Sequence, residues 1–283
     1  MRNSYKTLDK KGRLCVLWLS LCLLGVDSVF AARIYNGAPK LNLPVLLPHR
    51  EVKMAELWPT PGEETDYGII DEAHVRSLVA AFPNDRTYEF DLEGNRNRED
   101  LNLHLWHYDT SPATSVSLRK RMMSIIADER PDLDIGIWSI PNHVHTVQRD
   151  YRNKAKALAM IQREIEYQEV TKYSDTIYIS AYWRHRNPAD FRKLELWKKE
   201  VRLKVVLAET FHGQTPRVYI WHRGYQLVDE GNHRDGDFVD PAIFNEMLRF
   251  LDQEGLDIIF WAGLNDDYFP HWVVQALEGY ADK

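Results

Sequence analysis

Short apolar runs alternate with amphipathic stretches along most of the chain. Five runs rich in β-branched and aromatic residues end in polar or aromatic positions, and they span 87–93, 134–140, 176–183, 217–221 and 257–261. Apolar residues at helical spacing occupy 71–81, 115–128, 147–172, 188–211, 241–254 and 270–280. The pattern predicts strands and helices in alternation.

Strict alternation of strands and helices predicts a parallel sheet with right-handed crossovers. No Gly-x-Gly-x-x-Gly turn follows any of the runs, so a dinucleotide-binding fold is not favoured. One or two further strands fit the segment 33–52, which leaves fewer than eight. We therefore predict an α/β fold, a single irregular (β/α) barrel similar to a TIM barrel, over residues 32–283.

The N-terminal segment has the features of a secretory signal peptide. Five basic residues lie within 2–13, an apolar run of about thirteen residues follows, and small residues precede a cleavage site after Ala31. The run is too short to span a bilayer. We expect a secreted or periplasmic protein without stable membrane insertion, with an uncleaved anchor as the alternative. Cys15 and Cys22 both lie in this segment, so the mature chain would hold no thiol.

The charge of the chain argues against nucleic acid as a partner. Residues 1–31 hold five basic and two acidic residues, so their removal changes the net charge from −6 to about −9. No stripe of lysine and arginine offsets this negative charge, and a polyanion would be repelled. A neutral or weakly charged ligand is favoured.

Barrel enzymes carry their chemistry at the C-terminal ends of the strands. Asp91 and Glu93 alternate with Phe90 and Leu92, so both carboxylates should point towards the barrel axis near its mouth. Two carboxylates that lie close together do not both ionise easily, which raises the pKa of one towards that of a general acid. The alternative is a solvated strand face or an ion pair with Arg96.

Four tryptophans lie at predicted strand ends: Trp138, Trp183, Trp221 and Trp261. Aromatic faces at such positions can stack on the apolar C–H faces of sugar rings, while carboxylates and amides bind hydroxyl groups. Packing between barrel and helices is the alternative for about half of them, because strand alternation sends some side chains outwards.

The order of these motifs resembles the hyaluronidase-type glycoside hydrolases over residues 87–267. The matching segments are Asp91-Leu92-Glu93 with Arg96, Ser180-Ala181-Tyr182, Trp221-His222-Arg223-Gly224-Tyr225, and Trp261-Ala262-Gly263 with Asp266 and Asp267. The resemblance implies an irregular barrel that cleaves a polysaccharide or oligosaccharide, with 2-acetamido sugars as the expected substrate class.

The resemblance also implies roles for individual residues. Glu93 would be the acid and base, while Asp91 and Tyr182 would hold the substrate's own acetamido group as nucleophile. The substrate-binding candidates are Asn95, Arg96, Trp138, Trp183, Trp221, Arg223, Tyr225, Trp261 and Asp266. No cofactor and no metal are expected. Asn95 stands where the family has tryptophan, and Ala262 separates the family's Trp-Gly pair, so the resemblance implies a sugar-cleaving site more firmly than hyaluronan as its substrate.

Two other classes of function stay open. One is a carbohydrate-binding barrel without catalysis. The other is a metal-dependent hydrolase that uses loop histidines, of which His143 and His145 have metal-like spacing. The remaining candidates for that site are His104, His107, His185, His222 and His233, and the spacing fixes no third ligand.

Overall fold

The computed structural model of the protein describes residues 32–38, 40–41, 43–57, 70–92, 112–138, 162, 165–185, 187–227, 233–262 and 268–281. Residues 32–283 form one compact unit. The signal peptide predicted for 1–31 lies outside the described residues.

Seven parallel strands close into a barrel, as the alternation of strands and helices predicts. They are β1 (Ile34–Gly37), β2 (Leu47–Lys53), β3 (Thr87–Asp91), β4 (Asp134–Trp138), β5 (Thr176–Ser180), β6 (Arg217–Ile220) and β9 (Ile258–Trp261). Strand β9 pairs in parallel with both β1 and β6, and these two pairings close the ring. The segment 33–52 supplies two of the strands.

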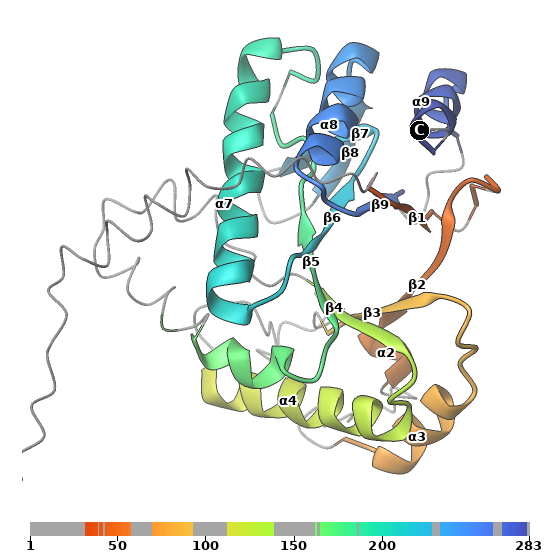
Figure 1. Cartoon of the computed structure of the whole chain (residues 1–283), viewed down its shortest axis with the longest axis vertical. Coiled ribbons are helices and arrows are strands. Elements are labelled where there is room, and N and C mark those ends of the chain that lie inside the picture. The colour runs from red at the N-terminus through yellow and green to blue at the C-terminus, as the bar shows by residue number, and fades with distance from the viewer. Residues whose placement is uncertain are drawn as a thin grey trace, which may run out of the picture. The chain divides into compact units, whose positions relative to one another are not determined.

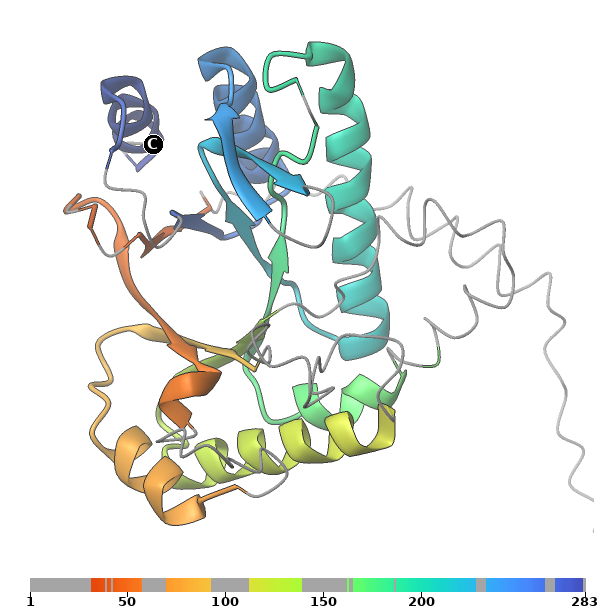
Figure 2. The ribbon, with the colours of Figure 1, turned by 180° about the vertical axis from the view of Figure 1, so that it is seen from behind.

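Helices follow the strands on the outside of the barrel (Figure 1). They are α2 (Met54–Leu57), α3 (Glu72–Ala80), α4 (Pro112–Glu129), α7 (Leu194–His212) after the 3-10 turn η2 (Phe191–Lys193), α8 (Pro241–Gln253) and α9 (His271–Ala281). Residues 165–171 are also helical and lead into β5. An antiparallel hairpin of β7 (Arg223–Leu227) and β8 (His233–Phe238), which the sequence pattern does not predict, lies beside α8 (Figure 2).

Local signals place α3, α7 and α8 where the sequence predicts helices, whereas residues 147–161 of the helix predicted for 147–172 lie outside the described residues. The side chain of Asp71 accepts a hydrogen bond from the backbone N–H of His74 and so caps α3. Asp240 caps α8 in the same way, with Pro241 at its first position, where the missing N–H has no cost. Helix α7 ends at Gly213, whose φ of 67° suits glycine.

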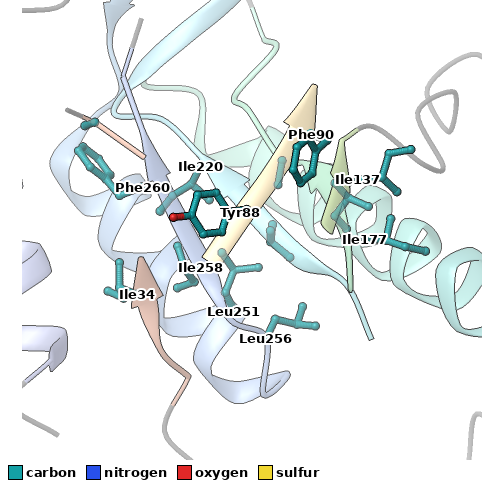
Figure 3. Packing of buried hydrophobic residues seen from close by; sticks show 14 of the residues in the cluster. Ile34, Tyr88, Phe90, Ile137, Ile177, Ile220, Leu251, Leu256, Ile258 and Phe260 are labelled. Atoms are coloured by element: carbon teal, nitrogen blue, oxygen red, sulfur yellow. The ribbon is translucent and has the colours of Figure 1, made fainter. Parts of the chain in front are cut away.

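The two faces of each strand pack against different partners. Outward-facing residues such as Ile177, Ile258 and Phe260 pack with helix residues in one large apolar core (Figure 3). Inward-facing residues form a second, aromatic cluster inside the barrel, made of Tyr35, Tyr178, Tyr182, Tyr219, Trp221 and Ile259. Both faces of β5, β6 and β9 are buried, so these three strands read as nearly continuous apolar runs.

Gly136 makes room for one ring of the inner cluster. A Cβ atom at this position would overlap the ring of Tyr178 and lie 2.8 Å from Cγ2 of Thr176, its Cα partner on β5. The Tyr178 side chain is completely buried and cannot turn away into solvent. The absence of a side chain at residue 136 is therefore a packing requirement of the barrel interior.

We expect Gly136→Ala to lower the free energy of unfolding by about 1–3 kcal/mol, because overpacking forces rings and backbone to shift. The matched control is Gly279→Ala on α9, where a Cβ meets nothing within 4 Å. That change should stabilise the protein by about 0.5–1 kcal/mol, as alanine is the better helix former. Urea denaturation measures the free energy of unfolding of both variants. Equal changes in the two variants would contradict the packing argument.

Candidate functional site

Aromatic rings from four strand ends meet inside the barrel at its C-terminal end. Trp138 ends β4, Tyr182 follows β5, Trp221 follows β6, and Trp261 ends β9. The ring centroids of Tyr182 and Trp261 lie 5.4 Å apart, and those of Trp221 and Trp261 lie 5.2 Å apart. Trp138 packs edge-on against Tyr219 at 4.6 Å. We call Trp138, Tyr182, Trp221 and Trp261 the mouth cluster.

The members of the mouth cluster differ in exposure. Trp221 is 1% exposed and Tyr182 is 8% exposed, whereas Trp138 and Trp261 are only partly buried. The centroid of the Trp138 ring lies 6.3 Å from that of Tyr182. The most accessible rings at the mouth are therefore those of Trp138 and Trp261, and the buried rings of Tyr182 and Trp221 pack against them.

The structure separates Trp183 from the other three candidate tryptophans. Its ring is fully buried in the outer core between the barrel and the helices, and its Nε1 donates to the carbonyl of Asn187 over 3.2 Å. The physical reason is the two-residue alternation, which turns Tyr182 inwards and the next residue outwards. These contacts favour a packing role for Trp183, and substrate binding by this residue stays a prediction.

Asp91 is the last residue of β3 and is partly buried. Tyr88 and Phe90 pack in the outer core, so alternation places Asp91 on the inner side of the strand. Its Cα partner on β2 is Lys53, which brings a cation to the neighbouring strand end. Glu93, Asn95, Arg96 and Asp266 lie outside the described residues.

Two further substrate-binding candidates belong to the hairpin. The guanidinium of Arg223, at the start of β7, lies 4.0 Å from the ring centroid of Phe238 at the end of β8. Tyr225 lies on the same strand. An isolated parallel bridge joins Gly224 to Trp183, so the hairpin continues from the ends of β5 and β6.

Below the mouth cluster, the barrel interior holds a buried polar network around His49. Its Nε2 lies 3.2 Å from Oε2 of Glu89 and 2.9 Å from the hydroxyl of Tyr219, while its Nδ1 lies 2.9 Å from Oγ1 of Thr87. The side chains of His49 and Glu89 are 0% and 2% exposed. Burial and the positive charge of Arg217 lower the pKa of His49 to about 3, so the imidazole is neutral at ordinary pH.

The amino-terminal end of the barrel is closed by an ion pair. Arg217 on β6 donates to both carboxylate oxygens of Asp134 on β4, over 3.3 and 2.6 Å, and to the hydroxyl of Tyr178 over 3.0 Å. Its guanidinium also lies 4.8 Å from the ring centroid of Tyr35. Burial raises the pKa of Tyr178, so its hydroxyl stays protonated.

The sequence pattern does not identify His49 or Glu89 as parts of the interior. Glu89 has a weak signal, because it alternates in step with Asp91 and Glu93 along β3. His49 has none, since its partners Thr87, Glu89 and Tyr219 are 38, 40 and 170 residues away.

The structure describes only some of the histidines that could form the metal site of a metal-dependent hydrolase. His222 is buried among the rings of Phe238, Phe260 and Phe269. The candidates His104, His107, His143 and His145 lie outside the described residues. Within the part of the chain that is described, no three His, Cys, Asp or Glu side chains are placed to hold a metal ion. Over the same residues, no helix is both long and apolar enough to cross a membrane.

Comparisons with known proteins identify relatives by fold alone. No family model matches the chain, and no curated protein matches it. A monoclinic crystal structure of bee venom hyaluronidase is 13% identical, with a TM-score of 0.54 over 89% of this chain and 98% of that one. A structure of bee venom hyaluronidase in complex with a hyaluronic acid tetramer is 12% identical, with a TM-score of 0.53 over 89% and 96%. The chain shares the fold of this glycoside hydrolase.

The buried imidazole predicts a loss of stability in acid. The unfolded chain takes up a proton on His49 near pH 6.5, whereas the folded protein takes it up only near pH 3. The free energy of unfolding should therefore fall between these values by up to about 1.4 kcal/mol per pH unit, with no contribution above pH 6.5. Denaturant titrations of the parent and of His49→Gln between pH 4 and 7 measure how the free energy of unfolding changes with pH. The same change with pH in both proteins would contradict this prediction.

Proposed function

We propose that this protein is a glycoside hydrolase that acts on glycans containing 2-acetamido sugars. The observation that carries the proposal is the mouth cluster, whose partly exposed rings of Trp138 and Trp261 can stack on sugar faces at the barrel end where β3 ends with Asp91. The fold likeness to bee venom hyaluronidase supports it, since that barrel is seen in complex with a hyaluronic acid tetramer.

In the proposed first step, Glu93 donates its proton to the glycosidic oxygen as the bond from that oxygen to C1 breaks. The carbonyl oxygen of the substrate's acetamido group forms a new bond to C1 from the opposite face. The product sugar leaves with the donated proton. Asp91 accepts a hydrogen bond from the acetamido N–H and offsets the positive charge that develops on the resulting oxazolinium ring.

The second step reverses the geometry of the first. The carboxylate of Glu93 takes a proton from water as the water oxygen attacks C1, and the bond between C1 and the acetamido oxygen breaks. Two inversions at C1 give net retention. In this scheme Tyr182 supports the acetamido group from a rigid position, because its ring is 8% exposed and packs against Trp261.

Export is part of the same proposal. The basic residues, apolar run and small residues of 1–31 would direct the chain out of the cytoplasm, and cleavage after Ala31 would leave residues 32–283 as the mature enzyme.

Glu93→Gln tests the assignment of the acid. The amide keeps the shape of the side chain but has no transferable proton, so turnover should fall by about 10²–10⁴-fold while glycan binding is kept. The matched control is Glu195→Gln on the exposed face of α7, which should leave turnover unchanged. Unchanged turnover by Glu93→Gln would refute the assignment. Binding without turnover in the parent would favour a carbohydrate-binding barrel.

The internal nucleophile predicts both specificity and stereochemistry. Only sugars with a 2-acetamido group should be cleaved, and NMR of the first-formed product should show the retained anomer. Asp91→Asn should lower kcat strongly with little change in binding, because its charge matters most as the oxazolinium cation develops. Cleavage of glycans with only hydroxyl groups at C2, or an inverted product, would discard this mechanism.

A further inference from the structure

Two buried cations from the outer helices reach the ends of β3 and β5. Nη2 of Arg119, on α4, donates to the carbonyl of Leu92 over 3.2 Å. Nζ of Lys204, on α7, donates to the carbonyl of Ser180 over 2.5 Å. Arg119 is 1% exposed and Lys204 is 6% exposed, so both hydrogen bonds lie within the outer layer of the barrel.

These positions face the apolar core, where a charged group is costly. Met122, Met123 and Ile126 of α4 are fully buried in the same layer as Arg119, and Val201 and Ala208 of α7 are buried in the same layer as Lys204. A buried cation loses its hydration and must recover that loss through hydrogen bonds. An apolar side chain would fill either position without this loss.

The surroundings of Lys204 disfavour the charged form of its amino group. Burial and the charge of Arg184 lower its pKa to about 7, and Glu200 only partly opposes them. Arg184 also donates to the hydroxyl of Ser180 over 3.2 Å. The end of β5 is therefore held by two basic side chains, and the charge of Arg184 makes protonation of Lys204 less favourable.

Arg119 is held in its own position by the helix that leads into β5. Nη1 of Arg119 donates to the hydroxyl of Tyr167 over 3.0 Å, and its guanidinium lies 5.4 Å from the centroid of the same ring. The planar fork thus joins that helix to the end of β3 in one fixed orientation.

The two carbonyl groups that accept these hydrogen bonds, those of Leu92 and Ser180, both lie at the C-terminal end of a barrel strand. Leu92 directly follows β3 and stands between Asp91 and Glu93 in the sequence, and Ser180 ends β5 two residues before Tyr182. Leu92 lies just past the last paired residue of β3, and Ser180 is the last paired residue of β5, so in both places a side-chain donor helps to fix where the following residues begin.

We propose that Arg119 and Lys204 are positioning residues that hold the ends of β3 and β5 so that Asp91 and Tyr182 keep the geometry of the reaction. This inference rests on the function proposed above. Since a displacement of about 1 Å can cost about 10²-fold in rate, loss of either cation should lower kcat much more than it changes KM.

The test compares Arg119→Met and Lys204→Met with the matched controls Arg121→Met and Lys199→Met, which change exposed cations on the same two helices. With a chitin-type or hyaluronan oligosaccharide, kcat should fall at least 10-fold in the two buried variants, with KM within 3-fold of the parent. The controls should keep the parent's values. Arg119→Lys should recover part of kcat, because an ammonium group can still reach one carbonyl.

Amide hydrogen exchange supplies a readout that needs no activity. Exchange should quicken in peptides that cover 88–92 in the Arg119 variants and 178–183 in Lys204→Met, with β1 and β9 unchanged. Where Arg119→Met does not fold, Arg119→Lys takes its place. Unchanged kcat or unchanged local exchange in a folded variant would overturn the inference. A parent that cleaves no glycan while exchange still changes as expected would refute the proposed function instead.

Discussion

A closed parallel sheet leaves an interior that side chains must fill, and this chain fills it in two kinds of layer. Polar groups occupy the lower part, where Arg217 pairs with Asp134 and His49 lies against Glu89. Aromatic rings occupy the upper part. Every buried polar group in such an interior needs a partner, because water is excluded from it. This requirement fixes the inward residues of β2, β3, β4 and β6 together, and with them the strand ends.

Tyr219 connects the two layers. Its hydroxyl lies 2.9 Å from Nε2 of His49, while its ring packs edge-on against Trp138. The polar network therefore orients one of the rings that a ligand at the mouth would meet. A ring that is already held in place loses little conformational freedom when a ligand stacks on it, which favours binding.

Much of the fold is readable from the sequence, because strands with both faces buried give continuous apolar runs and the helices give a clear period. The hairpin β7–β8 is not, since β7 alternates only over Tyr-Gln-Leu and β8 reads His-Arg-Asp-Gly-Asp-Phe, with one apolar residue. Their pairing is a tertiary effect. The candidate site is harder to predict from the sequence. Whether a tryptophan that follows a strand points into the barrel or towards the helices depends on how the alternation continues past the strand end, as Trp183 shows.

The helices outside the barrel explain why the alternation of side chains along a strand does not by itself determine the positions of the site residues. Past the last ladder hydrogen bond, a strand end can take several directions, and its position is decided by what the helices offer it. Here Trp197 donates to the carbonyl of Ala181 over 2.8 Å, next to the bond from Lys204 to Ser180. Neither donor can be matched to its acceptor by sequence spacing. The direction in which Tyr182 enters the mouth cluster therefore depends on helix α7 as much as on the strand that precedes it.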